Sequence, residues 1–178
     1  MDKKNHYDQK EKYMINEKCM ELKSVYDENG NECTKVRESE QTFIVRKSPE
    51  QIIDYSLNCI GFDLKGALKA AKLLLHLDKK YMLPVLINHV HEIVLFPTHS
   101  PKNHKNIWLN PKHIKRTFPK QKQTIIHFSN GETTIIEKKL IYFNNHFQTA
   151  KQYLENILEN VKNPGLLPYD PDLYGKSS

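Results

Sequence analysis

The stretch from residue 48 to residue 77, SPEQIIDYSLNCIGFDLKGALKAAKLLLHL, decides the fold, because helical spacing of apolar residues replaces a strand-like pattern there. Ser48 can accept a hydrogen bond from a backbone N–H of the first turn, and Gln51 completes a capping box. Pro49 suits that turn because its fixed φ is already helical. The small and apolar positions that follow share one face: Ile52, Ile53, Ser56, Leu57 and Ile60. We therefore predict a helix over residues 48–60.

The second half of the same stretch predicts another helix, over residues 63–77. Gly61 can end the first helix and Asp63 can cap the second. Three lysines recur at i, i+4 and i+7 and so share one narrow face: Lys65, Lys69 and Lys72. Such a row either faces water or matches a line of phosphates, and the spacing alone leaves both readings open.

Strand-like segments flank the two helices on both sides. Each is short, rich in β-branched or aromatic residues and bounded by turn residues. They cover residues 13–15, 22–26, 33–36, 42–45, 85–87, 93–96, 107–109, 124–128 and 133–136. Asn130-Gly131, between the last two segments, predicts a hairpin with a type I′ turn. A third helix is predicted over residues 146–162.

Strands at both ends around central helices favour an α+β fold over a doubly wound parallel sheet. The length of 178 residues suits one domain. We expect a flexible N-terminus over residues 1–10 and a single domain over residues 11–162. Residues 163–178 are expected to form an irregular tail, because prolines accumulate there and no apolar period is found.

The net charge of +6 is unevenly distributed along the chain. Residues 63–131 hold 12 Lys and Arg against 3 Asp and Glu, which gives +9, whereas both flanks are slightly acidic. No acidic residue occurs over residues 93–131. Ordinary surfaces intersperse both signs, and a one-sign surface is typical of a polyanion-binding site.

The bases of this segment are therefore the candidate contacts for nucleic acid. Besides the lysine row of residues 63–77, we select Lys102, Lys105, Lys112, Lys115 and Arg116, with His113 as a neutral donor. Trp108 lies inside the same segment and has two readings. It is either a core anchor or a platform on which single-stranded bases stack.

The composition disfavours several classes of protein. No run approaches the ~20 apolar residues of a membrane span, and the N-terminus lacks the apolar core of a secretory signal. Three cysteines without C-x-x-C spacing indicate reduced thiols and a cytoplasmic protein, with a Cys19–Cys33 disulfide as the alternative. Cys59 is expected on the apolar face of the first helix, as a core residue.

Motifs of catalysis, cofactor binding and metal binding are not found in the sequence. It contains no G-x-S-x-G, Walker or G-x-G-x-x-G pattern, so it predicts no enzyme and no nucleotide cofactor. His89 and His91 alternate, but Glu92 is the one further ligand type beside them, so no metal site is predicted.

Several short motifs occur in a fixed order from Tyr13 to Leu154, which is most of the chain. They are Tyr13-x-Ile15-Asn16, Asp27…Gly30, Cys33-Thr34-Lys35-Val36, Pro49-x-Gln51-Ile52-Ile53-Asp54-x-Ser56 with Gly61 and Gly66, Phe96-Pro97-Thr98-x-Ser100, Ile107-Trp108-Leu109 and Phe128-Ser129-Asn130-Gly131. No single piece is specific, but their order and spacing resemble those of the bacterial competence transcription factor family, ComK.

This resemblance implies a cytosolic DNA-binding activator of genes for DNA uptake and recombination. Members of the family bind paired A-tract and T-tract boxes in duplex DNA, largely through the minor groove, as higher-order oligomers. The resemblance also implies RNA polymerase and the adaptor of a Clp protease as partners. The narrow minor groove of an A-tract has an enhanced negative potential, which suits a lysine-rich surface.

Departures from the family pattern leave two other readings open. Ala67-Leu68 stand where the family usually shows a basic dipeptide after Gly66. Residues 80–85 are a loosened form of a Lys-Pro-Pro-Ile stretch, and the tail is shorter and less basic than usual. One alternative is a divergent interaction protein that modulates an active homologue or the Clp adaptor. The other, which rests on Trp108 and further Tyr and Phe residues rather than on these departures, is a binder of RNA or single-stranded DNA.

Overall fold

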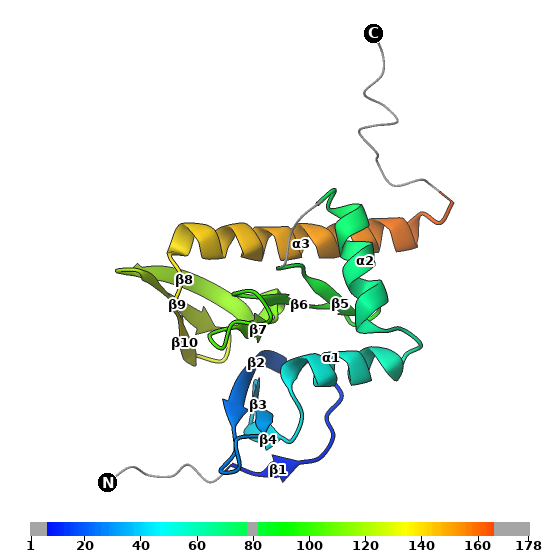
Figure 1. The fold of residues 1–178 in the computed structure, drawn as a ribbon. Coiled ribbons are helices and arrows are strands. Elements are labelled where there is room, and N and C mark those ends of the chain that lie inside the picture. Colours follow the sequence, from blue (N-terminus) through cyan, green and yellow to red (C-terminus); the bar gives the residue numbers. More distant parts are fainter. Residues whose placement is uncertain (1–6, 78–81, 166–178) are drawn as a thin grey trace.

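The computed structural model describes residues 7–77 and 82–165. Within these ranges the chain forms three α-helices, α1 (Pro49–Asn58), α2 (Leu64–Leu74) and α3 (Leu140–Lys162), and a short 3₁₀ helix, η1 (Pro111–His113). The helices combine with two largely antiparallel sheets (Figure 1), so the predicted α+β class is confirmed. None of the described helices has the length and apolar character needed to span a bilayer.

The strands alternate with short turns before and after the first two helices. They are β1 (Gln9–Lys10), β2 (Cys19–Tyr26), β3 (Glu32–Glu38), β4 (Thr42–Val45), β5 (Val85–Asn88), β6 (Ile93–Pro97), β7 (Ile107–Leu109), β8 (Ile114–Lys120), β9 (Gln123–Phe128) and β10 (Thr133–Ile136). The larger sheet has the order β1-β4-β3-β2-β7-β6-β5, in which β1 and β4 are parallel and the other pairs antiparallel. The smaller, antiparallel sheet has the order β10-β9-β8.

The two faces of the larger sheet carry separate cores, because successive side chains of a strand point to opposite faces. On one face, Ile52, Ile53 and Leu57 of α1 pack with Leu22 and Trp108 of the sheet. On the other face, α3 and the smaller sheet cover β6 and β7. This second core contains Met20, Phe96, Leu109, Ile126, Phe128, Ile136, Phe143 and Ala150.

The two central helices begin as the sequence predicts. The Oγ of Ser48 accepts from the N–H of Gln51 at 3.2 Å, and the Gln51 side chain accepts from the N–H of Ser48 at 3.0 Å, so the capping box is confirmed. Asp63 caps α2 by accepting from the N–H of Gly66. The helix ends at Leu74, earlier than predicted, because His76 adopts a φ of 51°.

Helix α3 begins at Leu140, before the predicted start at residue 146. Lys139 at its N-cap makes no side-chain capping bond, so no local signal marks this end. Instead Phe143 is fully buried, and its ring lies 5.8 Å from that of Phe96 and 6.1 Å from that of Phe147. Packing against the sheet therefore fixes the first turns.

Two further local predictions are corrected. A type I′ turn needs positive φ at both Asn130 and Gly131, but among these two only Gly131, at 90°, has it. Asn130 instead donates to the carbonyl oxygen of Ser39 and accepts from the N–H of Glu132. Residues 13–15 are not a strand, because the N–H of Ile15 bonds the Oγ of Ser56 at 3.0 Å.

The cysteines agree with the expected reduced thiols, whereas the disulfide alternative and the core position expected for Cys59 are corrected. Cys19 pairs with Glu38 and Cys33 with Val25, at opposite ends of the β2–β3 pair and about 20 Å apart, so the disulfide alternative is wrong. All three thiols are free. Burial raises the pKa of Cys19 to about 12. Cys59 is exposed because it is the C-cap of α1, where the chain leaves the core.

The structure describes only parts of the expected flexible N-terminus and irregular C-terminal tail. Gln9 and Lys10 of the expected flexible N-terminus form β1, which pairs with Ile44 and Val45. Residues 1–6, and residues 166–178 of the expected irregular tail, lie outside the described residues. The same is true of residues 80–81 in the loosened Lys-Pro-Pro-Ile stretch.

Candidate nucleic-acid interface

The candidate cations lie in three separate places rather than on one surface. One group is on α2, one on the loop between β6 and β7, and one on η1 and β8. Figure 1 shows α2 at one end of the molecule and the tip of the β8–β9 hairpin at the other. The structure therefore does not bring the predicted site residues together into one patch.

The lysine row of α2 is exposed along its whole length, as the predicted spacing requires. Lys65, Lys69 and Lys72 all face solvent, and none is in an ion pair among the described residues. Ala67 and Leu68 lie on the other side of the helix and pack on the core. The positions where the family usually has a basic dipeptide are thus turned inward in this chain.

The loop between β6 and β7 is less strongly positive than its sequence indicates. Lys105 forms an ion pair with Glu137, and the hydrogen bond from Lys105 lowers the pKa of Glu137. Lys102 lines a hollow of about 230 Å³ together with Glu32 and Glu50. Lys105 thus has a carboxylate partner, and Lys102 shares its hollow with two carboxylates, although residues 93–131 contain none.

His113 of η1 has a structural role. Its Nε2 lies 2.6 Å from the carbonyl oxygen of Glu17, which can only accept, so Nε2 carries the proton and donates it there. The carbonyl oxygen of His113 in turn accepts from the N–H of Ser129. His113 thus ties η1 to both neighbouring loops, and Lys112 beside it is exposed.

Strand β8 and its hairpin partner β9 form what we call the basic ribbon, residues 114–128. Lys115 and Arg116 are exposed on β8, and Lys120 and Lys122 lie at the turn, where Gln121 has a φ of 55°. None of these four bases is in an ion pair among the described residues. The charge of the ribbon is therefore uncompensated among the described residues, as is that of the lysine row of α2.

The register gives the basic ribbon an inner and an outer face. Thr117 pairs with Ile126, and these side chains face α3, where Ile126 is fully buried. Arg116, Phe118 and Lys120 alternate with them and so lie on the outer face. Strand β8 is also the edge of its sheet, so one side of its backbone has no strand partner within residues 7–77 and 82–165.

Sequence reasoning selected Lys115 and Arg116 but missed the strand that carries them. The segment Ile114–Lys120 has no apolar alternation, because the burial of β8 is low at almost every position. Pro119 further argues against a central strand, although it is compatible with an edge. The one available signal was the polar Gln121-Lys122-Gln123 stretch, which precedes a clear strand and can close a hairpin.

Trp108 is 2% exposed and belongs to the core under α1. The core reading is therefore confirmed, and Trp108 cannot serve as a stacking platform. Phe118 is the aromatic residue of the basic ribbon with substantial exposure, at 40%. Sequence reasoning did not single it out.

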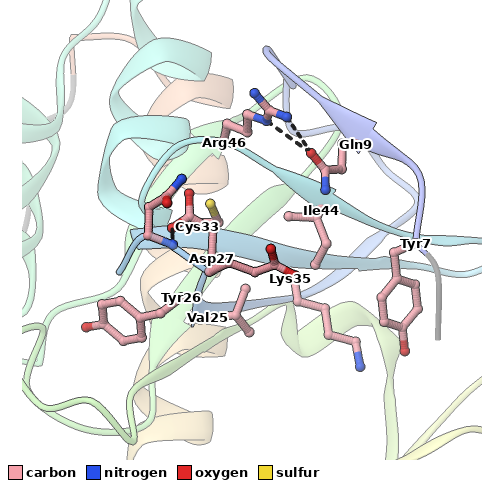
Figure 2. Close-up of a pocket in the computed structure, with 11 residues that line it drawn as sticks. Tyr7, Gln9, Val25, Tyr26, Asp27, Cys33, Lys35, Ile44 and Arg46 are labelled. Atoms are coloured by element: carbon pink, nitrogen blue, oxygen red, sulfur yellow. Dashed lines mark hydrogen bonds between the residues drawn. The ribbon is translucent and has the colours of Figure 1, made fainter. Parts of the chain in front are cut away.

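A hollow of about 610 Å³ lies on the open face of β2, β3 and β4 (Figure 2). Its cations already have partners within the chain. Arg46 donates two hydrogen bonds to the side-chain oxygen of Gln9, and the Lys35 ammonium lies 4.8 Å from the centre of the Tyr7 ring. Asp27 accepts from the side-chain amide of Asn31 and from the backbone N–H groups of its own turn, which lowers its pKa. The hollow thus offers no unsatisfied charged group to a ligand.

A metal-binding constellation is also absent from the part of the chain that the structure describes. No group of three or more His, Cys, Asp or Glu side chains is close enough to hold an ion there. His91 lies in a turn, and its Nδ1 is 3.1 Å from a carboxylate oxygen of Glu17.

Comparison with known proteins gives two matches. The family model described as ComK protein matches residues 10–162 of the chain. A competence transcription factor of Bacillus subtilis (strain 168) is 28% identical over 106 residues, which cover 59% of this chain and 54% of that protein. The chain thus spans about half the length of this curated relative. No solved structure matches.

Proposed function

The chain belongs to the ComK protein family, and from this premise we propose that it is a DNA-binding transcriptional activator of competence genes. Its proposed target is A/T-rich duplex DNA, bound in the cytoplasm by a homo-oligomer that contacts RNA polymerase. The competence transcription factor among its relatives supports this assignment. An adaptor of a Clp protease is a further proposed partner.

The basic ribbon is the observation that carries the proposal. Its four bases have no carboxylate within the same segment and no ion pair among the described residues. A surface of this kind attracts the phosphate backbone and releases its counterions on binding. Strands of a β-ribbon are also a known means of entering a DNA groove.

The lysine row of α2 is the second proposed contact surface. Because it lies at the far end of the molecule from the ribbon (Figure 1), the two surfaces would meet different stretches of DNA. We assign the first contact to the ribbon, since it combines cations with an exposed aromatic residue. Lys102 and Lys112 are proposed peripheral contacts, whereas Lys105 and His113 are already engaged within the chain.

The proposal is tested by the salt dependence of binding to an A/T-box duplex and to a scrambled duplex. Fluorescence anisotropy should show tighter binding to the A/T-box and a linear fall of log K with log salt concentration. The K115A/R116A variant should lower the slope by about 0.9 for each phosphate that these side chains neutralise. The K65A/K69A/K72A variant is measured in parallel, and its salt slope gives the contribution of α2 to DNA binding.

Two results would contradict this function. One is binding of the A/T-box duplex that does not weaken as salt rises. The other is equal affinity for the A/T-box and the scrambled duplex at every salt concentration, because a nonspecific polyanion binder behaves in this way.

A second candidate function is that of a divergent interaction protein acting on an active homologue or an adaptor. The inward packing of Ala67 and Leu68 favours it, because side chains that face the core cannot replace a basic dipeptide that binds DNA. Phe62 and Leu73 near α2 are also 58% and 70% exposed. Tight and selective binding of the purified chain to the A/T-box duplex would exclude this function.

A third function, the binding of RNA or single strands, has no platform at Trp108, because that ring is buried. Competition between single-stranded and duplex oligonucleotides of the same sequence distinguishes it. The proposed function expects the duplex to compete better.

A further inference from the structure

The outer face of the β8–β9–β10 sheet carries a row of apolar side chains that nothing in the described part of the chain covers. The register places Phe118 opposite Ile125, and Ile125 opposite Ile135. Phe118 is 40% and Ile135 47% exposed. Arg116 and Lys120 lie two residues on either side of Phe118 and share its face. An apolar row is thus bracketed by two cations.

The ring of Phe118 is held on this face by its neighbour. It contacts the His127 ring edge to face, with the ring centres 5.0 Å apart. The inner face has no room for it, because Thr124, Ile126 and Ile136 are buried there. The aromatic ring therefore stays at the surface in a defined position.

Charge decides what kind of partner fits this face. The segment 93–131 contains no carboxylate, and the bases of the ribbon are unpaired among the described residues. A second copy of the same face would place positive charge against positive charge. Nucleic acid instead offers phosphates at the edges of a groove and apolar sugar and base surfaces within it.

We propose that this outer face is the surface that meets the DNA minor groove, with Phe118 as its apolar anchor, wedged against a base step. The inference rests on the proposed function and names the residue that makes its non-ionic contact. Arg116 and Lys120 are four residues apart on the strand, or about 13 Å, whereas the minor groove is about 6 Å wide. The two cations can therefore reach phosphates on both sides of the groove while the ring enters it.

The test compares Phe118→Ala with Phe118→Leu, which keeps apolar bulk, and with Tyr55→Ala on α1, an aromatic residue that is also 40% exposed and lies outside the proposed contact surfaces. Binding is measured by anisotropy across a salt series. A duplex carrying 2-aminopurine in the A/T-box reports unstacking of the bases by an increase in fluorescence. Thermal melts of each variant check that the fold is retained.

We expect Phe118→Ala to bind roughly tenfold more weakly or worse, with an unchanged salt slope and without the 2-aminopurine increase. Phe118→Leu should retain part of the affinity, and Tyr55→Ala should behave as the wild type. The unchanged slope separates an apolar anchor from a phosphate contact, which would lower the slope.

Three results would overturn the inference. In the first, Phe118→Ala binds the duplex and unstacks its bases as the wild type does, while R116A and K120A still weaken binding. The assignment of Phe118 as the anchor is then wrong, but the proposed function stands. If Phe118→Ala changes the oligomeric state without changing DNA affinity, the face is a protein interface. If the wild-type chain does not distinguish A/T-box from scrambled duplex, the proposed function fails and the anchor fails with it.

Discussion

At the scale of single residues, His99 shows how the hydrogen bonds of a half-buried side chain depend on its charge state. Its Nε2 lies 3.1 Å from the carbonyl oxygen of Glu137, so it donates there. Its Nδ1 lies 3.0 Å from the Oγ of Thr98, which already accepts from the N–H of Ile107 and so gives its own proton to the ring. Neutral His99 satisfies all of these partners at once, and burial, with Lys138 and Lys105 nearby, lowers its pKa.

Protonation of His99 should therefore lower the stability of the fold as the pH falls. Because the folded pKa lies below the unfolded value of about 6.5, the unfolded state binds the proton first. His99 makes its full contribution to stability at pH values above its pKa in the unfolded state. This contribution is lost as the pH falls through its lower pKa in the folded state. We expect the melting temperature of the wild type to decrease more steeply from pH 7.5 to 5.5 than that of His99→Gln. Parallel pH profiles for the two proteins would contradict the role of His99.

At the scale of elements, α3 depends on packing more than on its own sequence signals. Its N-terminus has no side-chain cap, and Phe143 joins its first turns to Phe96 of β6 and to Phe147. The helix covers the inner face of the smaller sheet. Helix α3 therefore packs against the ribbon on the side opposite its outer face. Loss of the helix would remove the packing that holds this face in position.

Two adjacent substitutions test this dependence. Phe143→Ala removes a fully buried ring and should lower the free energy of unfolding by about 3–5 kcal/mol. Tyr142→Ala, at the next position, removes a ring that is 57% exposed and should change it by no more than about 0.5 kcal/mol. Urea unfolding measures both. Equal losses for the two variants would mean that α3 is not anchored through Phe143.

The elements also show which features the sequence could predict. Helix α1 was predictable because its start is local, with Ser48 and Gln51 three residues apart. The start of α3 was not, because Phe143 acts through a contact with a distant strand. Strand β8 was not predictable either, since an exposed edge strand needs no apolar alternation. The candidate bases were visible in the sequence, but their division into three places follows from the fold.

At the scale of the whole molecule, the outer face of the smaller sheet carries both positive charge and exposed apolar side chains. The fold buries Trp108, ties His113 to Glu17 and pairs Lys105 with Glu137, which removes three candidates from the polyanion surface. It leaves the outer face of the ribbon open at one end of the molecule and the lysine row of α2 open at the other (Figure 1). The central claim is that the ribbon makes the primary contact with DNA.

Backbone amide chemical shifts of the full chain, recorded with and without an A/T-box duplex, test this claim most directly. We predict that the largest shifts fall on residues 115–127 of the ribbon and around Ile135 of β10, and that a scrambled duplex gives weaker ones. The amides of α2 should change little at one equivalent of duplex. Shifts confined to α2, with the ribbon unchanged, would contradict the account.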